Sequence, residues 1–213
     1  MESVARGGTR WKRFAVVMVP SVAATAAIGV ALSQGALAAS FSVSGQQFKV
    51  TAKQLDGKGF VQYGAMDTGA SGKHPVAVVG MDSAKITNLC QSVVVPVPLF
   101  GNVSMKLTAG GEGGPRVEAK KLYIDADDLR ANATFTNVDI GVSIDRTTKG
   151  PGPNPGDKGD EPQHRKYVPD SFAQQADKVR FTDVKQRAWA TSAGTFKLSG
   201  LHMSVKKGKH ECY

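Results

Sequence analysis

The sequence contains only two cysteines, Cys90 and Cys212, and only four histidines among its 213 residues. Structural zinc sites use four cysteine or histidine ligands at short, fixed spacings. The two cysteines are far apart, and no histidine completes such a pattern with them. We therefore predict neither a metal site nor a bound cofactor.

The sequence also lacks a complete catalytic motif. Serine hydrolases of the elbow type use Gly-x-Ser-x-Gly, because the glycines permit the strained turn that exposes the nucleophile. The nearest match surrounds Ser71, and there Lys73 replaces the last glycine. His74 is close to Ser71 in the sequence, whereas members of a catalytic triad normally come from distant segments. The catalytic residues are thus unknown from the sequence, and whether the protein is an enzyme stays open.

Carboxylates gather at one point only, at Asp125, Asp127 and Asp128. Strand alternation would place Asp125 and Asp127 on one face, which suits a calcium ion or an acid–base pair. The glycine and glutamate spacing of a calcium loop is missing. We therefore interpret the cluster as a solvated strand face.

Charge of one sign dominates, because 27 lysines and arginines against 18 acidic residues give a net charge of +9. The basic residues are not interleaved with aromatic side chains, so nucleic acid is not an expected partner. The densest basic patch is Lys206–Lys209. Solubility is the favoured explanation of the charge, and contact with a membrane or cell-wall surface is the alternative.

The N-terminus does carry a strong pattern, that of an export signal. Basic residues at 10–13 precede the apolar run Phe14–Leu32, which small residues follow. These are the three parts of a secretory signal peptide. We predict that residues 1–38 are the signal and that cleavage falls between Ala38 and Ala39.

An uncleaved membrane anchor is the alternative for the same segment. The run Phe14–Leu32 has 19 residues, close to the length that spans a bilayer. Both the cleaved signal and the uncleaved anchor would place residues 39–213 outside the cytoplasm, in the cell envelope or the extracellular space.

Export bears on the two cysteines, because oxidising compartments favour disulfides. We predict a Cys90–Cys212 disulfide, which would tie the C-terminal tail to the middle of the chain. Free or intermolecular thiols are the alternative.

The remainder of the chain shows a period of two, the pattern of half-buried strands. Phe48, Val50 and Ala52 alternate with polar residues, and Val103, Met105 and Leu107 do the same. We predict a single β-rich domain over residues 39–213. Its fold class is all-β with a mainly antiparallel sheet, as a sandwich or an open or partly closed barrel, after the hydrophobic N-terminal segment.

Two segments depart from the strand pattern. Lys149–Pro169 is rich in glycine, proline and charge, so we predict a disordered loop that buries no core residue. Ser171–Lys178 is the best candidate for a helix, with Asp170 or Ser171 as its cap.

A short pattern of large apolar residue, Thr, Asn or Asp, and aliphatic residue occurs three times. It starts at Ile86, Phe135 and Phe181. Repeated sheet units are one explanation. The favoured explanation is that corners of the chain reuse Thr-Asn and Thr-Asp for their turn chemistry.

Several blocks of the sequence together resemble a family of small exported actinobacterial proteins of unknown function. The resemblance covers nearly the whole chain outside Lys149–Pro169. Family members are often labelled cholesterol esterase by automatic naming, which implies a lipid-like ligand and, for an enzyme, a carboxylic ester hydrolase. No catalytic residue is carried over, because the sequence lacks the motif. The blocks that carry the resemblance are Gly7–Ala15, Leu37–Gly45, Leu89–Ser92, Trp189–Thr191, Ala193–Leu201 and Glu211–Tyr213.

Three functions remain as hypotheses. The first is an exported protein that binds a hydrophobic, lipid-like ligand or the cell surface, which an apolar cavity would favour. The second is a lipid or sterol ester hydrolase, which a Ser–His pair would favour. The third is a structural envelope protein, which a long unpaired edge strand would favour.

Overall fold

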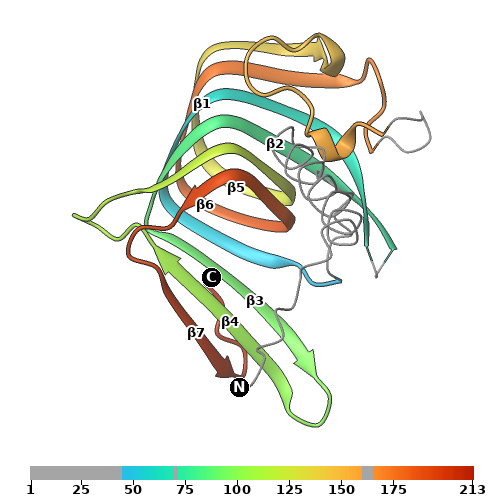
Figure 1. Ribbon diagram of the computed structural model, residues 1–213. Coiled ribbons are helices and arrows are strands. Elements are labelled where there is room, and N and C mark those ends of the chain that lie inside the picture. The colour runs from blue at the N-terminus through green and yellow to red at the C-terminus, as the bar shows by residue number, and fades with distance from the viewer. Residues whose placement is uncertain (1–44, 70–71, 160–165) are drawn as a thin grey trace, which may run out of the picture. The chain divides into compact units, whose positions relative to one another are not determined.

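A computed structural model describes residues 45–69, 72–159 and 166–213 (Figure 1). The predicted signal peptide, residues 1–38 with cleavage between Ala38 and Ala39, lies outside this range. Within the range, no helix has the length and apolar character needed to cross a membrane. The elements are β1 (Phe48–Gly69), β2 (Gly72–Thr87), β3 (Leu89–Val97), β4 (Gly101–Ala109), β5 (Val117–Ser143), the 3₁₀ turns η1 (Ile144–Arg146) and η2 (Pro155–Asp157), β6 (Phe172–Lys197) and β7 (His202–Lys207).

The strands form one antiparallel sheet in the order β2-β5-β6-β1-β3-β4-β7. Because β1 also pairs with β2, the four long strands β1, β2, β5 and β6 close a cycle of pairings. Figure 1 shows these strands curling around a common interior, while β3, β4 and β7 extend to one side. The predicted all-β, mainly antiparallel fold is confirmed, and the cycle of pairings gives it the form of a partly closed barrel.

The three short sequence repeats mark backbone bends. Their third residues, Asn88, Asn137 and Asp183, have positive φ angles of 52°, 53° and 54°. Asn and Asp enter this left-handed region more readily than other residues with a side chain. The structure therefore supports the explanation by turn chemistry, with the correction that two of the bends lie inside the long strands β5 and β6.

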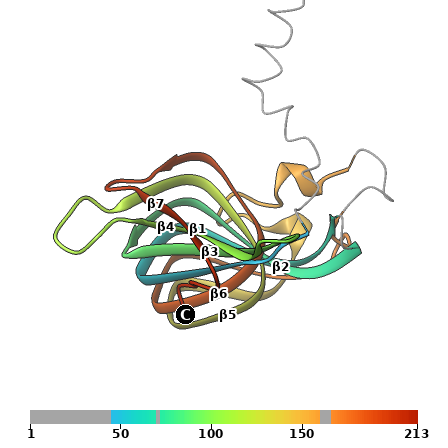
Figure 2. The ribbon, with the colours of Figure 1, turned by 90° about the horizontal axis from the view of Figure 1, so that it is seen from below.

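Each bend also resets which side of the strand faces inward. In a regular strand, residues three apart point to opposite faces. Phe181 and Val184 flank the bend at Asp183, yet both are buried in the same core cluster, and Ile86 and Leu89 repeat this arrangement around Asn88. The bends thus allow strands of 26 and 27 residues to wrap around one interior. Figure 2 shows the same curled strands from below.

Two apolar clusters cover the two faces of the sheet. The larger one fills the interior and contains Phe60, Met81, Val117 and Leu122, all fully or almost fully buried. The smaller one lies on the opposite face, because Val61 follows Phe60 directly and belongs to it. Burial on both faces requires a cover over the outer face, and residues that follow β5 supply it. The members of the smaller cluster are Val61, Tyr63, Ala65, Val76, Val78, Tyr123, Ile144, Tyr167 and Ala173.

The cover comes from the Gly- and Pro-rich segment, which corrects one expectation. Pro153, Asp157 and Tyr167 are buried, so Lys149–Pro169 does contribute to the packed structure. The Tyr167 ring packs edge-on against Tyr63 at a centroid distance of 5.8 Å. The composition predicted a disordered loop because the segment has few apolar residues. The segment nevertheless packs against the sheet, mainly through polar contacts. Residues 160–165 lie outside the described ranges, and disorder there stays a prediction.

The helix predicted at Ser171–Lys178 is wrong, because this segment begins β6. It pairs in antiparallel register with the end of β5, from Phe172 with Ser143 to Lys178 with Thr136. Ala173 and Ala176 are fully buried by this pairing. Sheet pairing and burial therefore override a weak local helix preference.

The C-terminal tail is fixed to the β3–β4 hairpin. Cys90 on β3 and Cys212 form a disulfide with their Cα atoms 6.0 Å apart. The backbone N–H of Cys212 donates to the Ser92 hydroxyl at 3.0 Å, and that of His210 donates to the Ser104 hydroxyl at 2.8 Å. The tail is thus held by two hydrogen bonds from its main chain in addition to the cross-link.

Candidate ligand-binding pocket

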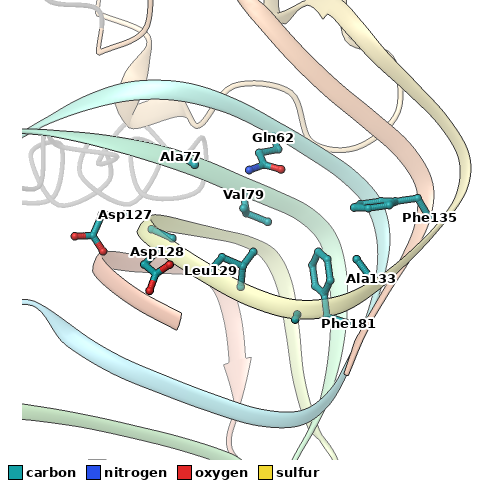
Figure 3. Close-up of a pocket in the computed structure, with 11 residues that line it drawn as sticks. Gln62, Ala77, Val79, Asp127, Asp128, Leu129, Ala133, Phe135 and Phe181 are labelled. Carbon is teal, nitrogen blue, oxygen red and sulfur yellow. The ribbon is translucent and has the colours of Figure 1, made fainter. Parts of the chain in front are cut away.

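An apolar pocket of about 330 Å³ opens where the curled strands approach one another (Figure 3). Ligand pockets for small molecules commonly have volumes of 300–1,000 Å³, so this one suits a small ligand or part of a larger one. Most of its walls are aliphatic or aromatic. The lining residues are Gln62, Ala77, Val79, Ala126, Asp127, Asp128, Leu129, Ala131, Ala133, Phe135 and Phe181.

Three phenylalanines support the apolar end of the pocket. Phe135 and Phe181 line it, and their ring centroids are 5.9 Å apart in an edge-on arrangement. Both rings contact Phe60, which is fully buried beneath them, at 5.2 and 6.2 Å. Because the core holds these rings in place, the pocket wall is preformed.

The opposite end of the pocket is polar. Figure 3 shows Asp127 and Asp128 at one end, with Phe135 and Phe181 at the other. The Asp127 carboxylate accepts from Arg187 Nε at 2.8 Å, and Arg130 Nε lies 3.4 Å from the Asp128 carboxylate. Charges of both signs therefore surround this end. With one apolar end and one charged end, the pocket is complementary to an amphipathic ligand.

Gln62 adds one polar group to the apolar wall. Its Oε1 accepts a hydrogen bond from Gln174 Nε2. Within the described residues the Gln62 Nε2 group has no hydrogen-bond acceptor, and the side chain lines the pocket (Figure 3). This amide is able to donate to a ligand oxygen.

The predicted pairing of Asp125 and Asp127 on one face is wrong. Register shifts interrupt the β5–β6 ladder on both sides of Ala126, so the inward-facing side of β5 changes there. Asp127 and Asp128 line the pocket, whereas Asp125 is 6% exposed on the other face. A β-bulge of this kind reorients side chains, and simple alternation does not reveal it.

Asp125 belongs instead to a buried cluster that the sequence did not indicate. Its neighbours are Asp67 from β1 and Asp157 from η2, which are 0% and 1% exposed. Lys166 Nζ lies 3.5 Å from Asp67 and 3.6 Å from Asp157. Tyr63 donates its hydroxyl hydrogen to Asp157 at 2.7 Å. One ammonium group thus faces three carboxyl groups.

Burial and this excess of carboxyl groups raise the pKa of Asp125 and of Asp157. Burial, followed by the charges of Asp67 and Asp157, raises the pKa of Asp125 to about 8. Burial also raises the pKa of Asp157, although the Tyr63 hydroxyl and Lys166 oppose the shift. At neutral pH Asp125 therefore keeps a proton, which it can donate to a neighbouring carboxylate such as Asp67.

The cluster fastens the covering segment to the sheet and is closed to a substrate. The backbone N–H of Asn154 donates to the Tyr63 hydroxyl at 2.8 Å, and that of Met66 donates to the Lys166 carbonyl at 2.7 Å. Because all three carboxyl groups are buried, we assign the cluster a structural role. Across the described ranges, no set of three or more His, Cys, Asp or Glu side chains is arranged to hold a metal ion.

The residues considered for hydrolysis do not assemble into a recognised site. Ser71 lies outside the described residues. The His74 ring stacks on the Trp189 indole with centroids 3.7 Å apart. The catalytic residues remain unknown, and the pocket residues Phe135 and Phe181 were found only through the tertiary structure.

Comparison with known proteins gives a family but no activity. Neither the curated proteins nor the solved structures contain a match to this chain. A family model described as "Family of unknown function (DUF6230)" matches residues 44–213. This range includes all seven strands, the apolar pocket and the disulfide. The chain therefore belongs to the DUF6230 family of unknown function.

Proposed function

We propose that this protein is exported and binds a small amphipathic, lipid-like ligand in the apolar pocket. The observation that carries the proposal is the pocket itself, with Phe135 and Phe181 at one end and Asp127 and Asp128 at the other. An apolar part of a ligand would pack against the rings, and its polar part would reach the charged end or Gln62. The disulfide is consistent with export, which the N-terminal sequence predicts.

Filling the pocket tests this proposal. Ala133 lines the pocket and is itself exposed, so Ala133→Trp would place an indole there without emptying the core. We expect the variant to bind a fluorescent fatty acid or fluorescent sterol at least about tenfold more weakly than the wild type, a change near 1.4 kcal/mol. Its thermal midpoint should stay close to the wild-type value.

Thr195→Trp is the matched control, because Thr195 is exposed on β6 and lines none of the pockets described here. This variant should bind the probe as the wild type does. Equal binding by Ala133→Trp and wild type, or no binding by the wild type, would contradict a ligand site in the pocket.

Mass spectrometry of the protein from its native culture tests export and the ligand together. We expect an intact mass that begins at Ala39 and is two hydrogens lighter than the reduced chain. Solvent extraction should release a lipid-like molecule. A mass that retains residues 1–38 would instead support the membrane anchor, and a protein without any extractable molecule would contradict a tightly bound ligand.

The hydrolase suggested by the family label stays a prediction. It requires a nucleophile, and the nearest candidate is Ser71. Ester turnover by wild type that is lost in Ser71→Ala would establish this activity in place of simple binding.

One observation favours the structural envelope hypothesis as a second candidate. Within the described residues, β5 pairs with β2 only as far as Ala126, so its part from Leu129 to Ser143 has β6 as its only ladder partner. An exposed strand edge is able to pair with another chain. Sedimentation that shows higher oligomers would support this candidate, whereas a monomer at high concentration would oppose it.

A further inference from the structure

A second concave site, separate from the apolar pocket, has a volume of about 600 Å³ and a strongly basic lining. We call it the basic groove. Five cationic side chains, Lys58, Lys85, Lys120, Lys178 and Arg180, face two carboxylates, Asp56 and Glu118. The lining thus carries an excess of three positive charges.

The two carboxylates of the groove already have cationic partners. Asp56 lies 2.6 Å from Arg116 Nη2 and 2.6 Å from Arg180 Nε. Its burial favours a higher pKa, but the hydrogen bonds from Arg180 and Arg116 outweigh burial and hold the pKa of Asp56 at about 2. Glu118 lies 3.8 Å from Lys85 Nζ. Two of the five cations are therefore neutralised locally.

The other three cations, Lys58, Lys120 and Lys178, have no ion pair with any carboxylate that the structure describes. The sheet register brings two of them together. Lys58 is paired with Ser83 on β2, and Ser83 is paired with Lys120 on β5. Directly paired residues point to the same face of a sheet. Ser83 thus lies between Lys58 and Lys120 in one row across three strands.

The β5–β6 ribbon forms the other side of the groove. Lys178 is paired with Thr136, and Arg180 with Thr134. The Arg180–Asp56 ion pair joins this ribbon to β1 next to Lys58. The third lysine without an ion pair is therefore also paired with a hydroxyl-bearing residue, and lysine and hydroxyl side chains from four strands line the groove.

We propose that the basic groove binds a phosphate-bearing anion. Lysine ammonium groups bind phosphate as point charges, and hydroxyl groups donate to the phosphate oxygens. Three unpaired cations exceed what a single carboxylate would neutralise, so a group with two or more negative charges fits better. An anionic phospholipid headgroup and a soluble phosphate compound share this chemistry.

Titration calorimetry with pyrophosphate tests the site. We expect the wild type to bind, and the variant with Lys58, Lys120 and Lys178 all changed to Gln to bind at least about tenfold more weakly. The wild-type affinity should fall as salt is raised, because salt screens exposed charges. The three lysines are outside the apolar pocket, so the variant should bind the hydrophobic probe normally. Failure of this proposal is therefore distinguishable from failure of the proposed function.

The matched control changes Lys73, Lys206 and Lys207 to Gln, which removes the same charge from exposed positions outside the groove. This control should keep wild-type affinity. An equal loss in the control would overturn the proposal, because the loss would then not come from the groove. The proposal would also be overturned if the wild type bound neither pyrophosphate at low salt nor anionic vesicles. Vesicles with and without phosphatidylglycerol provide the second arm. If binding that depends on Lys58, Lys120 and Lys178 is seen with the anionic vesicles alone, the ligand is a lipid headgroup. If such binding is also seen with pyrophosphate, the ligand is a soluble phosphate compound. Binding to neither excludes both ligands.

Discussion

Replacing Cys90 and Cys212 together by serine is expected to lower the free energy of unfolding by about 4 to 5 kcal/mol. The cross-link joins residues that are 122 positions apart, and a loop of that length strongly restricts the unfolded chain. Urea unfolding followed by circular dichroism measures the change. The double replacement is used because a single one would leave a reactive thiol.

A second variant separates the cross-link from the docking of the tail. Lys49 Nζ lies 3.1 Å from the Glu211 carboxylate and 3.1 Å from the Tyr213 carbonyl oxygen. Lys49→Gln removes these contacts and leaves the disulfide intact. We expect it to cost less than about 1 kcal/mol, since exposed ion pairs contribute little. If the double cysteine variant changes by no more than this, the cross-link does not limit the unfolded chain as we infer.

Replacing Asp125 by Asn is expected to raise stability at pH 8 by an amount on the order of a few kcal/mol. The pKa of Asp125 is raised by burial, and by Asp67 and Asp157, to about 8, above its unfolded value. Between about pH 4 and pH 8 the folded protein therefore binds more protons than the unfolded chain. The wild-type free energy of unfolding should be highest at the acidic end of this window and fall as pH rises through it.

An asparagine at position 125 has no proton to lose, so the pH dependence within this window should become flatter. Measuring unfolding from pH 4 to pH 8 for both proteins tests this. Asp127→Asn is the matched control, because Asp127 is on the same strand but exposed and paired with Arg187. The control should keep the wild-type slope and change stability by less than about 1 kcal/mol. A wild-type slope retained in Asp125→Asn would show that another group controls it.

The strands could be predicted from the sequence because a period of two is a local property. Phe48, Val50 and Ala52 alternate with polar residues wherever β1 finally lies. The helix predicted at Ser171–Lys178 is wrong for a related reason, because the sequence pattern reports only the local preference. Its residues permit a helix locally, and only the partner strand β5 makes the extended form the stable one.

The repeated Thr-Asn and Thr-Asp pattern was visible in the sequence, but its effect was not. Asn137 and Asp183 are suited to a left-handed backbone, and the sequence suggested corners. In the structure, however, these two corners lie within continuous strands. They arise because hydrogen bonding to neighbouring strands continues through the bend.

The candidate sites could be predicted least. The apolar pocket depends on the β-bulge near Ala126, which moves Asp127 and Asp128 to the pocket side. The basic groove depends on register, because Lys58 and Lys120 come from strands 62 positions apart in the sequence and meet beside Ser83. Neither arrangement has a local signal, since each is a property of strand pairing.

The strand-rich class and the Cys90–Cys212 disulfide could be predicted from the sequence, and residues 1–38 predict export. These depend on composition, local period and the number of available partners. Strand pairing and packing, by contrast, set which carboxylates are buried, where the pocket opens and which lysines share a groove. Burial, pKa and cavity shape depend on distances between strands, and those distances are fixed only when the long strands bend and pair around one interior.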